Sequence, residues 1–508
     1  MATLGDYRLS TPGANGIMTL THPVRRVAII GAGPCGLAAA KYLMAEKYFE
    51  QIDVFEQRNT IGGIWNYTPC FIKAEESSTT TVPNVDAQEP AERPTWTTSP
   101  HGNTEPIFVS PIYAHLETNN PKELLRFSEK ALPADAQLFP KHAVIRQYLE
   151  SYGEEVKDLV QFETQVQNLK VKDPQNNTWE LTATNLRTGA VITSTYDAVV
   201  AANGHYVVPY IPDILGVSAW NKAYPNSISH SKFYDSPEVF RGKKVVIIGG
   251  AASGLDIGAQ IGAVTKGKII VSQRSESYLA VSAPSDRTIR PQIAEFLPPA
   301  SHDREIRFSD GHVEDQVDAV LFCTGYFYSF PFLQTLEPPV VTDGSQTRNV
   351  YKQIFYIEHP TLAFPVLAQK VTPFPMAENQ AAVFARVWSG RLPLPSKEDM
   401  KASEDAEIAL RGDGKAFHVY EYPVDCDYMN EMYSWAGKAQ PRSGLDNDGH
   451  GKPSAFWGEK ERWLRSKFPD IRRAFVNQGE KRSEIKSIVD LGFEFGAWKR
   501  RQQGAPKL

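Results

Sequence analysis

The stretch Val27-Ala-Ile-Ile-Gly31-Ala32-Gly33-Pro34-Cys35-Gly36 decides the fold. A short apolar run, typical of a buried parallel strand, ends at a G-x-G-x-x-G turn, and a helix-forming stretch over residues 37–46 follows. Residues 52–55 predict the next strand. In such a βαβ unit the first glycine permits a tight turn, the second lets the backbone approach a pyrophosphate, and the third seats the helix on the strand. Residues 27–56 therefore predict a dinucleotide-binding unit.

The same order of elements returns later in the chain. Strand-forming Val245-Val-Ile-Ile248 runs into the turn Gly249-Gly250-Ala251-Ala252-Ser253-Gly254, and a helix and the strand 268–271 follow. Alanine replaces the middle glycine, and its methyl group should push a pyrophosphate slightly outward. In both units the N-terminus of the helix should face the phosphates, because its first N–H groups have no partner within the helix. We predict a second nucleotide-binding unit.

The two units differ in charge at one matching position. Counted equally from the first glycine, the first unit has Glu56 where the second has Arg274. A carboxylate accepts hydrogen bonds from a free ribose and repels a 2′-phosphate, whereas an arginine binds that phosphate. The alternative for Arg274 is a solvated surface residue. The residues predicted to bind FAD are Gly31, Ala32, Gly33, Pro34, Gly36, Glu56 and Gln57, and those predicted to bind NADPH are Gly249, Ala251, Ser253, Gly254, Ser272 and Arg274.

Composition excludes several other classes of protein. The 508 residues, with 42% apolar residues and a net charge of −5, describe a globular chain of two or three domains without a basic field for nucleic acid. The four cysteines form no C-x-x-C pair, so we expect no metal site and no disulfide scaffold. No apolar stretch approaches the roughly 18 residues of a spanning helix. We expect a soluble, cytoplasmic protein without a membrane anchor; the C-terminal Pro506-Lys507-Leu508 leaves a peroxisomal address as the alternative.

Further motifs lie outside the glycine turns. Gly62-Gly63-Ile64-Trp65 follows the first unit, the segment Tyr224 to Asp235 precedes the second, and Asp318 to Tyr326 closes it with Phe322-Cys-Thr-Gly-Tyr326. In this order they resemble the flavin-containing monooxygenase family, most closely its soluble fungal branch. The family's identifying segment is F-x-G-x-x-x-H-x-x-x-(Y/F)-(K/D), of which this chain keeps the histidine and the terminal Tyr-Asp.

Two residues depart from that identifying segment. Tyr224 replaces phenylalanine, and Asn226 replaces a glycine in a hinge-like linker between the nucleotide domains. Glycine would allow backbone angles that most residues avoid, and asparagine is the next best residue there. We expect His230 to pack in this linker rather than to donate a proton.

The resemblance also implies site residues around the flavin. Gly63, Ile64 and Trp65 would lie beside it, and in the family an asparagine of a T-N pair contacts both the flavin and NADP. The matching pair here is Thr118-Asn119, which makes Asn119 the candidate catalytic residue. The alternative interpretation of this region is a helix start, with Asn120 as the cap, Pro121 in the first turn and Glu123 in a capping box.

The predicted fold class is α/β, with two Rossmann-like dinucleotide-binding domains, the NADP domain inserted into a larger discontinuous FAD domain. We place the first part of the FAD domain at residues 1–212 and the NADP domain at 213–328. Residues 329–508 would complete the FAD domain and add a C-terminal helical region. Residues 73–106 are polar and lack apolar periodicity, so we expect a long, mobile surface insertion.

The function implied by the resemblance is monooxygenation. NADPH would reduce FAD, O2 would add at flavin C4a to give a hydroperoxide, and a small amine, thiol or thioether would attack it, so that the protein needs no metal or catalytic triad. N- and S-oxygenation stay open, and a homo-oligomer is expected because many relatives are oligomers. The alternatives are a Baeyer–Villiger-type monooxygenase and a redox-sensing flavoprotein without turnover. A pyridine-nucleotide disulfide reductase would need a cysteine pair that this chain lacks.

Overall fold

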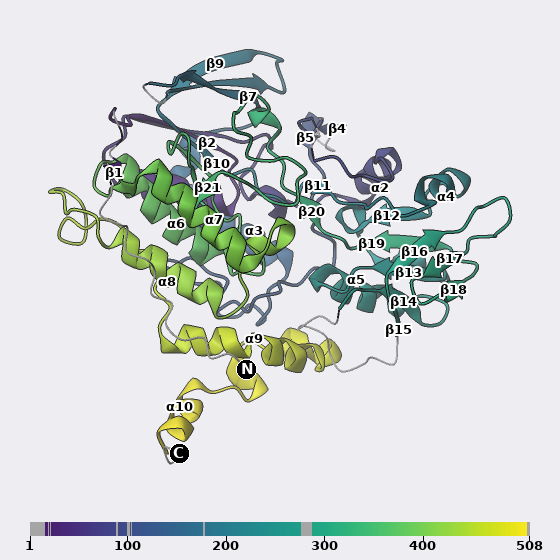
Figure 1. Cartoon of the computed structure of the whole chain (residues 1–508). Helices are drawn as coiled ribbons and strands as arrows, with labels where there is room; N and C mark the ends of the chain where they lie inside the picture. Colours follow the sequence, from purple (N-terminus) through teal and green to yellow (C-terminus); the bar gives the residue numbers. More distant parts are fainter. Residues whose placement is uncertain are drawn as a thin grey trace.

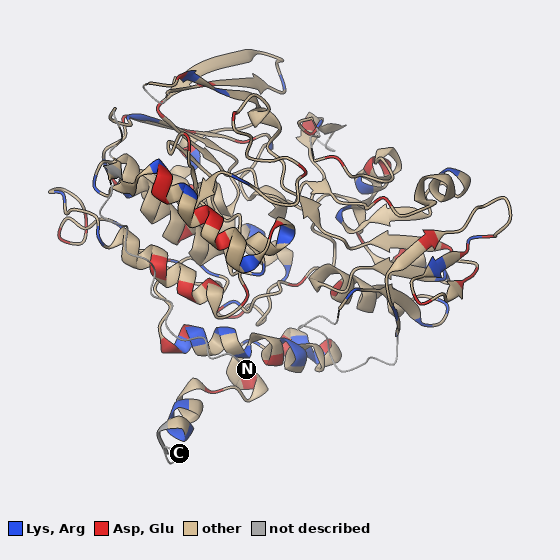
Figure 2. Ribbon diagram, in the orientation of Figure 1, with Lys and Arg blue, Asp and Glu red and all other residues tan. Residues whose placement is uncertain are grey.

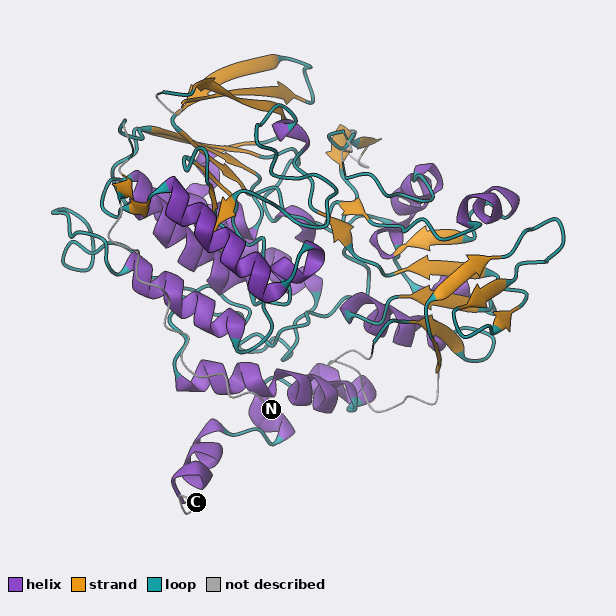
Figure 3. Ribbon diagram, in the orientation of Figure 1, coloured by secondary structure: helices purple, strands orange, loops and turns teal. Residues whose placement is uncertain are grey.

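Two α/β lobes lie beside each other in the computed structural model, each built on a parallel sheet (Figure 1, Figure 3). The structure describes residues 16–18, 20, 22–87, 90–98, 102, 104–175, 178–275 and 287–504. The Pro506-Lys507-Leu508 terminus on which the peroxisomal alternative depends lies outside these residues. No helix in the described ranges combines the length and the apolar character needed to cross a membrane.

The first lobe contains a seven-stranded sheet of order β21-β22-β23-β10-β2-β3-β6. Strands β23, β10, β2, β3 and β6 run parallel, whereas β21 and β22 are antiparallel to their neighbours. The bounds are β2 (Arg26–Ile30), β3 (Gln51–Phe55), β6 (Val160–Gln161), β10 (Ala198–Ala201), β21 (Val350–Tyr351), β22 (Phe355–Tyr356) and β23 (Leu362–Ala363).

Both faces of this sheet are covered, which explains its unbroken apolar strands. Val27 and Ile29 pack with the helices α1 (Pro34–Ala45) and α6 (Pro373–Trp388), which lie against each other. The alternate residues of the strand face an antiparallel sheet of β7 (Thr164–Asp173), β8 (Thr178–Asn185) and β9 (Val191–Tyr196), where Trp179 is fully buried.

The second lobe contains a parallel five-stranded sheet of order β12-β19-β13-β14-β15. Helix α5 (Ala252–Gly262) packs on one face. A small sheet, β16 to β18, and helix α4 (Val217–Ala223) cover the other. The strand bounds are β12 (Ile228–His230), β13 (Val245–Ile248), β14 (Ile269–Ser272), β15 (Arg287–Arg290), β16 (Ile293–Phe296), β17 (Ile306–Phe308), β18 (Val313–Glu314) and β19 (Ala319–Phe322).

The second lobe is an insertion in the first. All its strands lie in sequence between β10 and β21, two strands of the seven-stranded sheet. The chain leaves the first lobe through β11 (Val208–Pro209) and returns through β20 (Tyr326–Phe327), and these two crossings pair side by side. The predicted fold class, a nucleotide domain inserted into a larger discontinuous one, is therefore confirmed.

The polar insertion does not form the mobile surface segment that we expected. It contains the helix α2 (Cys70–Thr79) and the hairpin of β4 (Thr95–Thr98) and β5 (Thr104–Ile107), and it packs against the second lobe. Buried Lys73 donates to the carbonyl oxygens of Tyr234 (3.0 Å) and Ile112. Lys232 forms an ion pair with Glu92 at 2.8 Å. The expectation was wrong because polar groups, rather than apolar periodicity, attach the segment.

The C-terminal region is helical, as predicted. Helix α7 (Lys397–Arg411) buries only Met400 and Glu404 and carries charges of both signs, as does α9 (Glu459–Val476) (Figure 2). Helix α9 also contacts the second lobe, because Arg472 of α9 is nearly buried and its Nη2 lies 3.8 Å from Asp256 of α5. The remaining elements are β1 (Ile17–Met18), β24 (Leu394–Pro395), α3 (His142–Gly153), α8 (Val424–Ala436) and α10 (Phe495–Gly504).

Asn226 and His230 do not lie in a linker between the nucleotide domains, as we expected, but within the second lobe: Asn226 is in the turn between α4 and β12, and His230 ends β12. Asn226 has a φ of 63°, a left-handed conformation that glycine or asparagine adopts most readily. His230 is fully buried; its Nδ1 accepts the Lys232 N–H, and its Nε2 lies 3.0 Å from the Gly325 carbonyl. The histidine is therefore packed inside the second lobe and ties the end of β12 to the segment that follows β19.

Burial of His230 makes the stability of the protein depend on pH. Desolvation lowers the pKa of His230 to about 3, whereas an unfolded histidine titrates near about 6.5. Below about pH 6.5 only the unfolded chain takes up this proton, so the free energy of unfolding falls by about 1.4 kcal/mol per pH unit down to about pH 3. Urea unfolding at several pH values should show a shallower slope for His230→Gln. An unchanged slope would remove His230 from this dependence.

Candidate active site

The two glycine turns have the same backbone geometry. Gly31 and Gly249, the first glycines, have φ values of 104° and 110°. A Cβ on Gly31 would lie 2.6 Å from the Ala202 carbonyl oxygen, and a Cβ on Gly249 would lie 2.5 Å from that of Cys323. Each turn is thus packed against the end of the neighbouring strand, β10 in the first lobe and β19 in the second. No side chain fits at either position.

The third glycines are equally constrained, and the middle positions are not. A Cβ on Gly36 or Gly254 would lie 1.9 Å from the carbonyl oxygen of the first glycine of its own turn. A Cβ on Gly33, the middle residue of the first turn, would meet the Gly63 backbone at ordinary contact distances, 3.5 Å from Cα and 3.9 Å from N. Protein packing therefore does not require a glycine there, which is consistent with Ala251 at the same position of the second turn.

Both turns open onto the N-terminus of a helix without a side-chain cap. Gly33 precedes α1 and Ala251 precedes α5, and neither receives a side-chain hydrogen bond at the cap. The first N–H groups of the two helices are thus available to an anionic ligand, which the helix dipole also favours. A pyrophosphate fits both positions.

One cavity of about 1750 Å³ joins the two turns. It exceeds the roughly 300–1,000 Å³ that is usual for one small ligand, so it has room for two nucleotides. Of the predicted site residues, Ala32, Gly36 and Gly254 do not line it. The predicted residues that line it are Gly31, Gly33, Pro34, Glu56, Gln57, Gly63, Ile64, Trp65, Thr118, Asn119, Gly249, Ala251, Ser253, Ser272 and Arg274.

Glu56 and Arg274 occupy contrasting environments at the matching positions. The Glu56 carboxylate is 3% exposed and accepts the N–H groups of Ala32 and Arg58, each at 2.8 Å. Burial raises the pKa of Glu56, although Arg58 and these hydrogen bonds oppose the shift. Arg274 follows β14, is exposed, and lines the opposite end of the cavity. The two turns thus bring side chains of opposite charge to the same cavity, and their roles in binding the two nucleotides stay a prediction.

The loop with Asn119 reaches the same cavity. Thr118 is buried and its hydroxyl donates to the Asn120 carbonyl at 2.9 Å, while the Asn119 side chain is exposed within the cavity lining. Among the residues that the structure describes, the Asn119 amide has no hydrogen-bond partner. The alternative helix start is wrong, because only one turn forms: the Leu124 and Leu125 N–H groups bond to the Pro121 carbonyl at 3.0 Å, but the Arg126 N–H bonds to the Leu124 carbonyl instead of continuing a helix.

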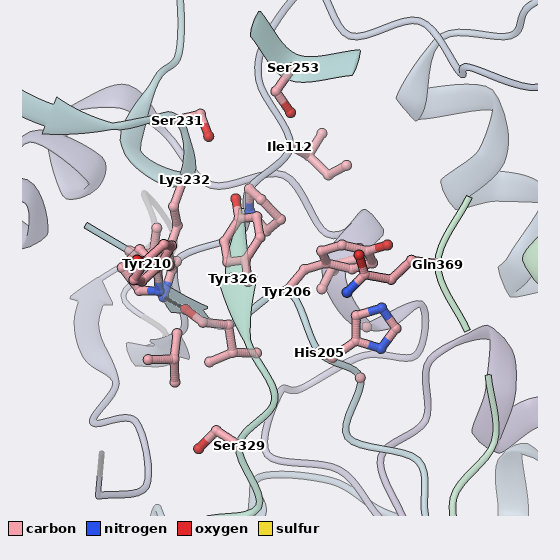
Figure 4. A pocket seen from close by; sticks show the side chains of 18 of the residues that line it. Ile112, His205, Tyr206, Tyr210, Ser231, Lys232, Ser253, Tyr326, Ser329 and Gln369 are labelled. Carbon is pink, nitrogen blue, oxygen red and sulfur yellow. Dashed lines mark hydrogen bonds between the residues drawn. The ribbon is translucent and has the colours of Figure 1, made fainter. Parts of the chain in front are cut away.

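Sequence reasoning missed an aromatic group in the middle of the cavity. His205 and Tyr206 follow β10, and Tyr326 lies between Ser253 and the His205 side of the cavity (Figure 4). His205 is 9% exposed, its Nε2 has no hydrogen-bond partner in the described part of the chain, and burial lowers its pKa to about 4. A neutral imidazole thus faces the space between the turns. Tyr326 closes the motif Phe322 to Tyr326, and His205 follows the buried strand β10, so their places after two buried strands could have identified them.

The cysteines do not form a thiol relay. All four are free, and burial raises the pKa of Cys35 and Cys323, which line the cavity, to about 12. Cys35 lies at the first turn and Cys323 at the second. Within the described ranges, no group of three or more His, Cys, Asp or Glu side chains could hold a metal ion.

Comparison with known proteins agrees with this geometry. Residues 102–287 and 287–439 match the model of the flavin-binding monooxygenase-like family, and residues 29–68 match that of an NAD(P)-binding Rossmann-like domain. A flavin-containing monooxygenase of Aspergillus flavus is 28% identical over 499 residues, 89% of this chain and 99% of the relative. The thiol-specific monooxygenase of Saccharomyces cerevisiae is 31% identical over 400 residues, 74% of this chain and 80% of the relative.

A solved structure extends the likeness to the fold. The S-allyl-L-cysteine S-oxygenase from Allium sativum superposes with a TM-score of 0.72 at 26% identity, covering 96% of this chain and 99% of that one. The family model spans more than half of the chain. The protein therefore belongs to the flavin-binding monooxygenase-like family and is an enzyme of the flavin-containing monooxygenase type, a membership that implies FAD and NADPH as its cofactors.

Proposed function

We propose that the protein uses FAD and NADPH to transfer one oxygen atom of O2 to the sulfur of a small thiol or thioether. Two of the relatives favour sulfur over nitrogen, because their names describe a thiol-specific monooxygenase and an S-oxygenase of S-allyl-L-cysteine. The observation that carries the proposal is the single cavity, which both glycine turns and the Asn119 loop line.

The residues of the chain would bind and orient the two nucleotides. The N-termini of α1 and α5 would hold the two pyrophosphates, Glu56 the ribose of FAD and Arg274 the 2′-phosphate of NADPH. When bound, FAD and NADPH supply the electrons and the site at which oxygen reacts. Asn119 would offer a neutral amide that donates a hydrogen bond at neutral pH without releasing a proton.

The polar insertion would keep water out of this centre. Besides the Lys73 contacts, the backbone of Asn84 pairs with that of Ile211, next to the crossing, at 3.0 and 3.1 Å. Glu76, Thr80 and Asn84 also line the cavity. The insertion is thus one wall of the site, attached to both lobes. Exclusion of water protects a reactive oxygen species from unproductive breakdown.

The test is a comparison of substrates with the FAD-loaded enzyme. NADPH oxidation, O2 consumption, H2O2 release and product mass are measured with glutathione, S-allyl-L-cysteine and trimethylamine. We expect one S-oxygenated product per NADPH with a sulfur substrate and mainly H2O2 without one. Coupling with the amine alone would contradict the choice of sulfur. A flavin that NADPH never reduces would contradict the enzyme and favour the redox-sensor alternative.

A further inference from the structure

A second cation, from the first lobe, lines the same cavity as Arg274. Lys415 lies in the short 3-10 helix η6 (Gly414–His418), which follows α7. Its side chain extends to the crossing between the lobes, where Nζ lies 4.2 Å from the centre of the Tyr210 ring and 3.4 Å from the Thr324 carbonyl oxygen. Thr324 follows β19, a strand of the second lobe. Lys415 and Arg274 both line the cavity.

The backbone around Lys415 is fixed by contacts on both sides. Before it, Asp413 accepts two hydrogen bonds from Arg348, at 2.7 and 2.9 Å. After it, the Nε2 of buried His418 accepts the Thr347 N–H at 2.9 Å. The Gln369 N–H donates to the His418 carbonyl at 2.7 Å. Because η6 is held at both ends, Lys415 needs little reorganisation to bind a ligand in the cavity.

The charge around these two cations is unbalanced. Neither Lys415 nor Arg274 forms an ion pair with a carboxylate in the part of the chain that the structure describes. Burial lowers the pKa of Lys415, and the positive charge of Arg274 lowers it further. Two like charges held in one partly buried space favour the binding of an anion between them.

We propose that Lys415 and Arg274, from opposite lobes, together bind the 2′-phosphate of NADPH. The proposal rests on the use of NADPH proposed above. Arginine supplies a planar fork with several donors and lysine a compact charge, and the two complement each other on a phosphate. The phosphate would then link the second lobe to the loop at η6. NADH lacks this phosphate and could not make the link.

The test compares NADP+ and NAD+ binding to the FAD-loaded protein by calorimetry. Loss of one charged contact to phosphate should raise the Kd of Lys415→Met for NADP+ by about 10- to 100-fold, with little change for NAD+. Lys415→Arg should restore most of the affinity. The double variant Lys415→Met/Arg274→Met should bind NADP+ no more tightly than NAD+. The control is Lys268→Met, at the exposed opposite end of β14.

The role of Lys415 and the use of NADPH would be contradicted by different results. If Lys415→Met binds NADP+ as the unmodified enzyme does, or weakens NADP+ and NAD+ equally, Lys415 does not recognise the 2′-phosphate and the inference is overturned. If the unmodified enzyme shows no preference for NADP+ over NAD+, the proposed use of NADPH fails as well. Equal flavin content and melting temperature in all variants would show that they fold.

Discussion

The Gly254→Ala variant will keep its flavin but will no longer be reduced efficiently by NADPH. A Cβ at this position would lie 1.9 Å from the Gly249 carbonyl oxygen, so the turn must open and the N-terminus of α5 must move. A displacement of about 1 Å in a binding site can cost about a hundredfold in rate. We expect the rate of anaerobic flavin bleaching by NADPH to fall at least about that much.

The glycine turn of the first unit offers a variant that matches Gly254→Ala. Gly36→Ala makes the same 1.9 Å collision in the first unit, so this variant should be purified without flavin. The control is Gly267→Ala in the second lobe, where the added Cβ would meet nothing within 4 Å. Because Gly267 has a φ of 81°, that variant should lose about 1 kcal/mol of stability and keep normal reduction. Normal reduction of Gly254→Ala would show that α5 does not bind the nucleotide.

The Asn119→Ala variant will accept electrons from NADPH normally but will release them as H2O2. The amide is exposed in the cavity, so its removal leaves the packing of the loop intact. Arg472 of α9 also supports the loop, since its Nη1 donates to the Thr118 carbonyl at 3.4 Å. Loss of one hydrogen bond in the reacting centre should lower the ratio of product to consumed NADPH by about tenfold or more.

A second substitution at this position tests the chemistry of the side chain. Asn119→Asp keeps the size of the residue but replaces the amide donor with a carboxylate, so it should also release H2O2. Product, H2O2 and NADPH are measured together, and flavin reduction is followed separately without oxygen. Normal coupling in Asn119→Ala would remove the residue from the mechanism.

The local patterns of the sequence predicted the nucleotide units well. The strand, turn and helix of each unit are neighbours in the chain. The glycine spacing reflects the lack of room for a side chain at the first and third positions of each turn. The contrast of Glu56 with Arg274 could be found by counting alone. Asn226 was also interpreted correctly, because a left-handed conformation leaves few residue types to choose from.

Contacts between distant segments could not be predicted in the same way. No periodicity near Lys415 indicates that it lines the same cavity as Arg274. The sequence of the insertion did not indicate how it is attached, because Lys73 donates hydrogen bonds to carbonyl groups that lie far from it in the chain. The capping pattern at 120–123 also failed: it is followed by a single turn, after which the Arg126 N–H bonds to the Leu124 carbonyl and no helix continues.

The pairing of β10 with β23 determines the order in which the two lobes can fold during translation. The seven-stranded sheet needs residues up to Ala363, and α1 gains its partner only when α6 emerges from the ribosome. The five-stranded sheet needs only residues 228–322. Because domains fold as units while translation proceeds, the NADPH lobe becomes complete first. The flavin pocket, whose turn is translated earliest, closes around FAD only after that.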